Sequence, residues 1–506
     1  MEQVSKLTYS PLRSALWLPA GAVLLFLSAV LTVFTPWYIS TVVFVCTLLS
    51  LIILFKPSWG LYLLVLLVPA TPFSIGFIIV APWNYEIATR YADIIPFFTP
   101  LVPLTVAGLL FIKFSRLEQV SFRDPLLLIS LLLLGYAGIS LNWSANPEHS
   151  VFEFFHFLIN VLLYLSIVAL IDDKKKYRIL MWTWIISITV QGIIAMALFA
   201  YESVIVSHHL LPTFLFHFRM YGDMLLPNGA PNPAAGLQDF HETSLLTNMA
   251  AALCFGMLFT VPKRSKKFAL LALLFLFLLF ISMRTESRAG IGAMLVMLMA
   301  LALLIPPLKY RQVRTSVLFI VCAGSLYAAT HLYLYTMTEV DQKPRMVFII
   351  EEILGGGKLI DTGHKKKESG RMYMYKRAFR TFFSNQPQRG LGIGNLKYLV
   401  LLPHAHSLYF SLILDFGLAG LLFLAALVYI LLQRLYLIIK LPDSPNRTMA
   451  LAATSGLIGA ATHCLVDFEY LYTSLWLFLG LVMTSYNMAL SVDVDKQTTD
   501  RNLLPS

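Results

Sequence analysis

Two histidines stand where a basic loop of this chain leads back into an apolar segment. His404 and His406 follow Pro403, Ser407 comes next, and nine residues separate Ser407 from Gly417. Imidazole titrates near neutral pH, so either histidine could accept a proton from a hydroxyl nucleophile. A histidine at the beginning of a helix is also a common capping or interfacial residue. The pair by itself therefore leaves a catalytic and a structural interpretation open.

Arginines that precede the histidines could bind an anion. Arg284 and Arg288 flank one end of an apolar run and lie one helical turn apart, on the same face. Residues 371–384 show the apolar spacing of an amphipathic helix, and Arg371 falls on its apolar face. Because guanidinium groups bind phosphate oxygens through two parallel hydrogen bonds, Arg288 with Arg371 is a candidate diphosphate clamp. A salt bridge for Arg371 and interfacial anchoring for Arg288 are the structural alternatives.

The composition of the chain predicts that these residues are carried by membrane-spanning helices. Of the 506 residues, 58% are hydrophobic and only 13% are charged, which excludes an ordinary soluble protein. Apolar runs long enough to cross a hydrocarbon core predict an all-α, polytopic transmembrane bundle of about 12 to 14 helices. The runs lie near 15–34, 38–55, 59–80, 94–112, 126–142, 151–171, 179–200, 243–262, 268–283, 288–308, 316–335, 407–433, 448–466 and 470–490.

Basic residues in the short connections alternate from one side to the other, as fourteen helices require. This pattern predicts that both termini are cytoplasmic. It divides the chain into N-terminal helices over 1–335 (about eleven), a large external loop over 336–406, C-terminal helices over 407–490 (about three) and a cytoplasmic tail over 491–506. A second long loop, about 201–242, is also expected outside.

The large loop is unusually basic for an external segment. It holds twelve Lys and Arg from Lys343 to Lys397, which indicates an anionic partner. The Gly-rich segment 390–394 follows Pro387 and predicts a tight backbone turn. It lacks the Lys-Ser/Thr of a nucleotide-binding loop and is not flanked by a strand and a helix. We expect a turn that brings the loop back under the amphipathic helix, and its amides could also face phosphate.

Other polar residues in the apolar segments are expected to be structural. Asp415 lies about two turns into the helix predicted at 407–433, and His463 and Asp467 lie one turn apart near the end of another. The four cysteines lie within apolar segments and offer neither a disulfide framework nor the spacing of metal ligands. We therefore expect no metal, no cofactor and no nucleic-acid partner.

In their order and spacing these motifs resemble the O-antigen ligase and polymerase superfamily. These bacterial membrane glycosyltransferases, of the GT-C type, act on glycans linked to undecaprenyl diphosphate. His406, Ser407 and Gly417 match the His-[Asn/Ser/Gln], nine residues, Gly signature of the family. Three further stretches resemble the segments that precede that histidine: Ser287-Arg288-Ala289, then Arg371, Tyr375 and Ala378, then Pro387 with Gly390, Gly392 and Gly394.

The resemblance covers residues 284–420 and departs from the family at two places. Tyr375 stands where tryptophan is commoner, and the segment from Arg219 to Asn248 lacks the family's Gly-x-x-x-Asn-Pro-Asn-type motif. The resemblance implies catalytic roles for Arg288, Arg371 and His406. The arginines would hold the diphosphate, and His406 would take the proton from, or orient, the attacking hydroxyl. Further contacts with the substrates are expected from residues near these three: Arg284, His404, Arg219, Ser407 and Tyr375.

The implied donor is an undecaprenyl-diphosphate-linked glycan, and the acceptor decides the reaction. Lipid A-core would make the protein a ligase, a second lipid-linked glycan a polymerase, and a protein hydroxyl an O-oligosaccharyltransferase. The spacing after His406 fits the ligase somewhat better. The implied location is the bacterial cytoplasmic membrane, in contact with membrane lipids, with the active site facing the periplasm or exterior. A multi-helix transporter is the alternative, but such a protein should gather its polar groups near the bilayer midplane.

Overall fold

The computed structural model describes residues 52–53, 56–67, 101–115, 124–205, 240–285, 287–305, 380, 382–383, 388–395, 407–465 and 471–502. Throughout these residues the regular structure is helical and no strand occurs, which confirms the predicted all-α class. The chain divides into two compact units, residues 1–64 with 73–120 and residues 65–72 with 121–506. The runs predicted at 15–34 and 316–335 lie outside the described residues.

The first unit contains α6 (Leu101–Ser115) and all but the last three residues of α3 (Pro57–Leu67). Gly60 allows these helices to approach closely. A Cβ atom there would lie 2.6 Å from Ile53 Cγ2 and 2.7 Å from Thr105 Oγ1. Small residues at such positions are typical of helix contacts in membranes.

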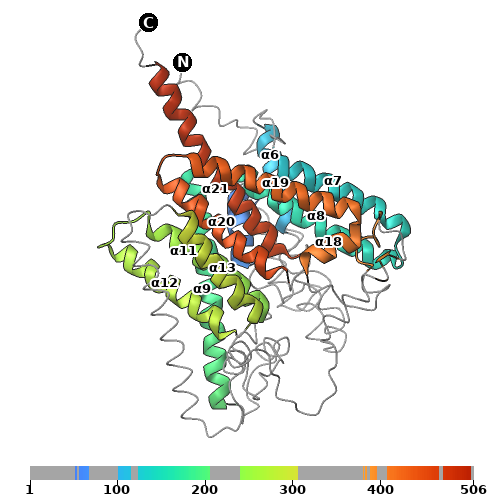
Figure 1. Cartoon of the computed structure of the whole chain (residues 1–506), viewed down its shortest axis with the longest axis horizontal. Coiled ribbons are helices and arrows are strands. Elements are labelled where there is room, and N and C mark those ends of the chain that lie inside the picture. Colours follow the sequence, from blue (N-terminus) through green and yellow to red (C-terminus); the bar gives the residue numbers. More distant parts are fainter. Residues whose placement is uncertain are drawn as a thin grey trace, which may run out of the picture. The chain divides into compact units, whose positions relative to one another are not determined.

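The second unit contains the remaining helices, in the order of the predicted apolar runs (Figure 1). They are α7 (Pro125–Ser140), the 3-10 turn η3 (Leu141–Trp143), α8 (Pro147–Leu170), α9 (Lys174–Ile205), α11 (Phe240–Leu258), α12 (Lys266–Arg284), α13 (Arg288–Leu304), α18 (Leu408–Phe416), α19 (Leu418–Lys440), α20 (Pro445–His463) and α21 (Thr473–Asn502).

Five of the described helices are long and apolar enough to cross a membrane, which confirms a polytopic membrane protein. They are Pro125–Trp143, Pro147–Leu170, Lys266–Arg284, Leu418–Lys440 and Thr473–Ser491. Large apolar side chains on their outer faces are exposed, for instance Leu132 on α7 (66%) and Leu432 on α19 (60%). Exposed apolar faces of this kind are suited to lipid rather than water.

Polar capping residues determine where several of these helices begin. Asp124, Asn146, Ser265, Ser287 and Ser444 each accept a hydrogen bond from a backbone amide in the first turn that follows. Such side chains satisfy amides that have no partner within the helix. A proline follows three of the five caps, where its missing amide proton is not needed.

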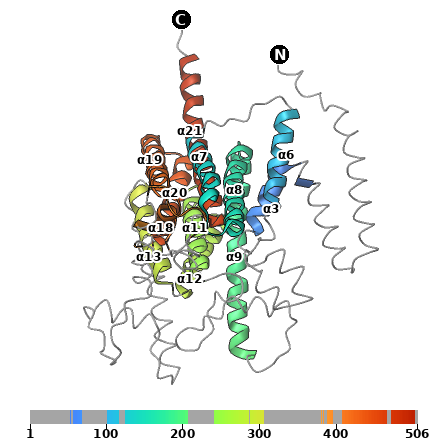
Figure 2. The ribbon, with the colours of Figure 1, turned by 90° about the vertical axis from the view of Figure 1, so that its right-hand side faces the viewer.

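Small residues pack α11, α13 and α20 together at the centre of the second unit. A Cβ atom on Gly256 of α11 would lie 2.5 Å from Ala452 Cβ of α20, and one on Gly459 of α20 would lie 2.8 Å from Met297 Cβ of α13. Contact this close replaces the hydrophobic driving force that lipid cannot supply. The long helix α9 packs against α11 and α12, and its C-terminal part extends beyond them (Figure 2).

The prediction of one continuous helix over 407–433 was wrong. The chain forms α18, breaks at Gly417 and continues as α19. Gly417 has φ 57° and ψ −129°, a conformation open to glycine and strained for other residues. Gly420 completes the break, because a Cβ atom there would lie 2.1 Å from the Leu412 carbonyl oxygen. The two glycines therefore let α19 turn back against α18.

Candidate functional site

The Gly-rich segment after residue 387 is a tight turn, as predicted. Gly390, Gly392 and Gly394 have φ values of 72°, 91° and 70°, in the left-handed region that favours glycine. Space is also short, since a Cβ atom on Gly390 would lie 2.4 Å from the Asp415 carbonyl oxygen. We refer to residues 388–395 as the glycine loop.

The glycine loop joins the broken ends of α18 and α19. The Leu391 amide donates to the Leu414 carbonyl oxygen and the Gly392 amide to that of Asp415, both at 2.8 Å. These carbonyls belong to the last turn of α18 and have no acceptor role within that helix. In return, the first amide of α19, at Leu418, donates to the Gln388 carbonyl oxygen at 3.1 Å. The amides of Leu391 and Gly392 therefore bind carbonyl groups at the end of α18 and are not available to phosphate.

The other side of the glycine loop is bonded to α7 and α8. The Ile393 amide donates to Ser140 Oγ (3.1 Å), and Ser150 Oγ donates to the Ile393 carbonyl oxygen (2.6 Å). Asn395 Oδ1 accepts from the Ala145 amide at 2.8 Å. These partners could not be predicted from the sequence, because isolated Ser and Asn residues carry no motif. Through them the segment preceding residue 396 is fixed to helices more than 240 positions earlier in the chain.

A second polar group lies where α11, α13 and α20 meet. His241 Nδ1, near the beginning of α11, is 2.8 Å from Ser287 Oγ, and Ser287 Oγ accepts from the Gly290 amide at 3.0 Å. The His241 ring packs edge to face against His463, with centroids 6.0 Å apart and planes at 70°. His463 ends α20 and is fully buried. We call His241, Ser287 and His463 the histidine cluster.

Buried hydroxyl and amide groups next to the histidine cluster form a hydrogen-bonded network. Ser282 Oγ donates to Asn248 Oδ1 at 2.8 Å, and Asn248 Nδ2 donates to the Gly290 carbonyl oxygen at 3.0 Å. Ser244 Oγ lies 3.0 Å from Ser282 Oγ. Because a hydroxyl has one proton and Ser282 gives its own to Asn248, Ser244 is the donor in that contact. These bonds join α11, the end of α12 and the first turn of α13.

One backbone bond links the histidine cluster to α18. The Leu408 amide donates to the Cys464 carbonyl oxygen at 3.1 Å, and Cys464 follows His463 directly. Ser407, just before α18, is 1% exposed. With nine residues, α18 is about 14 Å long at the rise of an α-helix. It therefore connects the histidine cluster at its beginning with the glycine loop at its end.

The predicted site residues are described in part. Arg284 is the last residue of α12 and is half-buried, Arg288 is the first residue of α13, and Ser407 immediately precedes α18. The histidine cluster brings the backbone at Ser287 and Ser407 into one region. The remaining predicted positions, together with the side chain of Arg288, lie outside the described residues: Arg219, Arg371, Tyr375, His404 and His406.

Most of the helix predicted over 371–384 also lies outside the described residues. Within it, residues 380 and 382–383 are helical. Arg380 is exposed and Phe382 is buried, as the spacing of an amphipathic helix over 371–384 predicts. Among the described residues, no three His, Cys, Asp or Glu side chains come together as a metal-binding group.

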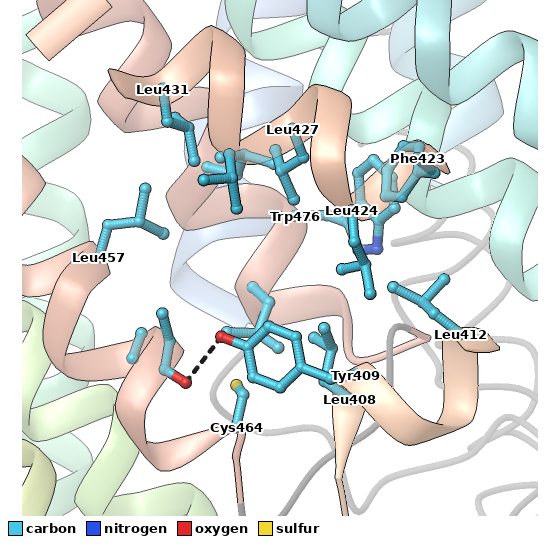
Figure 3. A pocket seen from close by; sticks show the side chains of 15 residues that line it. Leu408, Tyr409, Leu412, Phe423, Leu424, Leu427, Leu431, Leu457, Cys464 and Trp476 are labelled. Carbon is cyan, nitrogen blue, oxygen red and sulfur yellow. Dashed lines mark hydrogen bonds between the residues drawn. The ribbon is translucent and has the colours of Figure 1, made fainter. Parts of the chain in front are cut away.

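An apolar pocket of about 140 Å³ opens beside the beginning of α18 (Figure 3). Leu408, Tyr409 and Cys464 lie at one end of it and Leu427 and Leu431 at the other. The only polar contact drawn inside it is the Tyr409 hydroxyl, which donates to the Ala461 carbonyl oxygen at 2.9 Å. Cavities of this size with an apolar lining stay dry and accept hydrocarbon groups. The pocket is therefore suited to a hydrocarbon chain.

The sequence model of the O-antigen ligase family matches residues 273–425. A comparison with curated proteins finds no match. The matched segment begins within α12, includes the first turn of α13 and the glycine loop, and ends within α19. It therefore contains Ser287, Arg288, His406, Ser407 and Gly417. Over residues 273–425 the chain is thus similar to the O-antigen ligase family, which confirms the resemblance that its motifs indicated.

Proposed function

We propose that this membrane protein transfers a glycan from undecaprenyl diphosphate to an acceptor hydroxyl on the outer face of the bacterial cytoplasmic membrane. The observation that carries the proposal is the position of two motifs within the O-antigen ligase domain. Ser287-Arg288 begins α13 and His406-Ser407 leads into α18. The histidine cluster joins these two helix ends.

The arginines supply the electrostatic part of the proposed mechanism. Arg288 and Arg371 hold the diphosphate and stabilise the negative charge that develops on it as the glycosidic bond breaks. Arg288 is the first residue of α13, where the positive end of the helix dipole also favours an anion. No metal is needed in this scheme, because the guanidinium groups carry the compensating charge.

His406 supplies the proton chemistry. Its imidazole accepts the proton of the acceptor hydroxyl, or orients that hydroxyl, as the oxygen attacks the anomeric carbon. The bond from that carbon to the diphosphate oxygen breaks, and undecaprenyl diphosphate leaves. A single displacement inverts the anomeric configuration. Arg284, Arg219, His404, Ser407 and Tyr375 are proposed to contact the sugars or the diphosphate around this centre.

The apolar pocket beside α18 supports a lipid-linked donor. Its lining comes from α18, α19, α20 and α21, and its near end is formed by Leu408, one residue after Ser407. A polyprenyl chain lying there would place its diphosphate at the beginning of α18. Val428 of α19 lines the pocket and is 50% exposed, which favours entry of a lipid from the side.

Lipid A-core is the proposed acceptor, on the spacing that follows His406. A second lipid-linked repeat unit and a protein hydroxyl are the alternative acceptors. The basic loop over 336–406 is proposed to face the periplasm or exterior, and both termini, including the tail over 491–506, the cytoplasm.

Reconstitution tests the function directly. The purified protein in lipid nanodiscs is incubated with undecaprenyl-diphosphate oligosaccharide and, separately, with lipid A-core or a second equivalent of donor. We expect release of undecaprenyl diphosphate and a product on lipid A-core with inverted anomeric configuration. A product formed only from two donors would identify a polymerase. No release of undecaprenyl diphosphate with any acceptor would refute the proposed activity.

A further inference from the structure

The proposed mechanism does not use the histidine cluster, although both of its histidines adjoin the proposed site. Ser287, which contacts His241, directly precedes Arg288. His463 directly precedes Cys464, whose carbonyl oxygen holds the first amide of α18. The cluster therefore adjoins the beginning of α13 directly and the beginning of α18 through Cys464.

The hydrogen-bond chemistry fixes how His241 acts on α13. Ser287 Oγ accepts the Gly290 amide proton, and this bond caps the helix that Arg288 begins. The 2.8 Å hydrogen bond between Ser287 Oγ and His241 Nδ1, whichever of the two atoms donates it, holds the same oxygen from a second direction. The imidazole nitrogen thus holds the rotamer in which Ser287 caps α13. Without that nitrogen, the Ser287 hydroxyl has other rotamers available, and the first turn of α13 is less fixed.

Burial makes this arrangement rigid. Ser287 and His463 are fully buried, and the hydroxyl and amide groups of Ser244, Ser282 and Asn248 beneath them are each at most 1% exposed. Polar groups that water does not reach depend on one another for hydrogen bonds, so the geometry around Ser287 is tightly coupled, and the half-buried His241 contacts it from the edge. The His241 ring is also fixed by its edge-to-face contact with His463.

We propose that His241 is a positioning residue for Arg288, acting through the Ser287 hydroxyl, and that its contact with His463 keeps the beginning of α13 aligned with the beginning of α18. This inference rests on the proposed function, since it assumes that Arg288 binds the diphosphate of the donor. His241 itself touches neither the donor nor the acceptor in this scheme.

Two substitutions distinguish the effect of the His241 nitrogen from the effect of its ring. His241→Asn keeps a hydrogen-bonding atom near the position of Nδ1 and removes the ring, whereas His241→Phe keeps the ring against His463 and removes the nitrogen. The kcat and the KM for the undecaprenyl-diphosphate donor are measured for each variant in nanodiscs. His241→Phe is expected to lower kcat/KM about tenfold to a hundredfold, the scale of a misplaced binding group, mainly through a higher KM. His241→Asn is expected to recover most of the loss.

Combining these variants with Arg288→Ala tests whether His241 acts through Arg288. In the Arg288→Ala background, His241→Phe should change kcat/KM by no more than about twofold, because the group it positions is gone. A full, multiplicative loss in that background would overturn the proposal, and so would equal losses in His241→Asn and His241→Phe. His156→Asn serves as the control, since His156 is another histidine at a helix interface, with its Nε2 3.4 Å from Thr473 Oγ1. His156→Asn should change the Tm, but its effect on kcat/KM should not depend on whether Arg288 is present.

Binding of undecaprenyl diphosphate to the purified protein, measured by native mass spectrometry, gives a readout that does not require turnover. Arg288→Ala and His241→Phe should weaken binding to a similar extent, and His241→Asn should not. If the wild-type protein binds this lipid but transfers no glycan, the proposed function fails and the binding series alone decides the positioning role. A wild-type protein that does not bind the lipid would refute both.

Discussion

The Leu408 amide donates a hydrogen bond to the Cys464 carbonyl oxygen at 3.1 Å, so α18 begins directly against the end of α20. Because Leu408 is two residues after His406, this bond fixes the backbone that follows the proposed base. The ring of His463, just before Cys464, extends the same contact to His241 and α13. The backbone at Leu408 and the first turn of α13 are thus linked through His463 and His241.

His406→Ala is expected to lower glycan transfer by about 10²- to 10⁴-fold, the range over which a general base contributes. His404→Ala is the matched control, two residues away in the same loop, and should have a much smaller effect. Initial rates of transfer from undecaprenyl-diphosphate oligosaccharide distinguish the two variants. Undiminished transfer by His406→Ala would exclude it as the base.

Ser287→Ala removes both the cap of α13 and the contact with His241. We expect a stability loss of about 0.5–2 kcal/mol, as for other helix caps, together with weaker donor binding. Ser265 caps α12 in the same way, accepting from the Phe268 amide at 3.1 Å, but α12 ends nineteen residues later at Arg284. Ser265→Ala should therefore lower the Tm and leave the donor KM unchanged. Equal effects of the two variants on the KM would contradict the role given to Ser287.

Gly390→Ala should destabilise the join between α18 and α19. Its φ of 72° and the 2.4 Å approach to the Asp415 carbonyl oxygen leave no room for a methyl group. A loss of more than about 1 kcal/mol is expected, seen as a lower Tm in detergent. Gly135 in α7 is the control, because a Cβ atom there meets nothing within 4 Å. Gly135→Ala should not lower the Tm. A comparable drop in Tm for both variants would show that the contact at Gly390 is not specifically tight.

Filling the apolar pocket should impair the use of long lipid tails. Leu427→Trp places a larger side chain in the pocket, whereas Leu432→Trp on the outer face of the same helix does not. The KM for an undecaprenyl donor should rise in Leu427→Trp alone. The KM for a donor with a short alkyl chain should be the same in both variants and in the wild type. If Leu427→Trp raised the KM for both donors, the substitution would have distorted the site in general.

The sidedness of the membrane topology can be tested with single cysteines in intact cells. A cysteine at Lys343 in the large loop should react with a membrane-impermeant maleimide, and one at Lys175, in the first turn of α9, should not. The natural cysteines all lie within apolar segments, so their background labelling should be low. Labelling at position 175 but not 343 would invert the proposed topology.

Local patterns in the sequence predicted the membrane class of the protein, most of the helices among the described residues and the resemblance to the O-antigen ligase family. Apolar length is a local property, so α8, α12 and α20 appear within a few residues of their predicted positions. The motifs around His406 and Arg288 are also local, and the O-antigen ligase match contains them both. Capping residues such as Asn146 and Ser444 could have sharpened the predicted helix beginnings, since Asn-Pro and Ser-Pro are cap signals.

The contacts between these helices became visible only in the folded protein. Glycine is common within membrane helices, so composition could not distinguish Gly417, which breaks a helix, from Gly456, which packs inside one. The bond from Ile393 to Ser140 and the contact from His241 to His463 each join residues more than 200 positions apart. A lone Ser or His in an apolar run has no spacing that reveals its partner. The partner is fixed by the packing of whole helices, because a buried polar group must find a hydrogen bond wherever that packing places it.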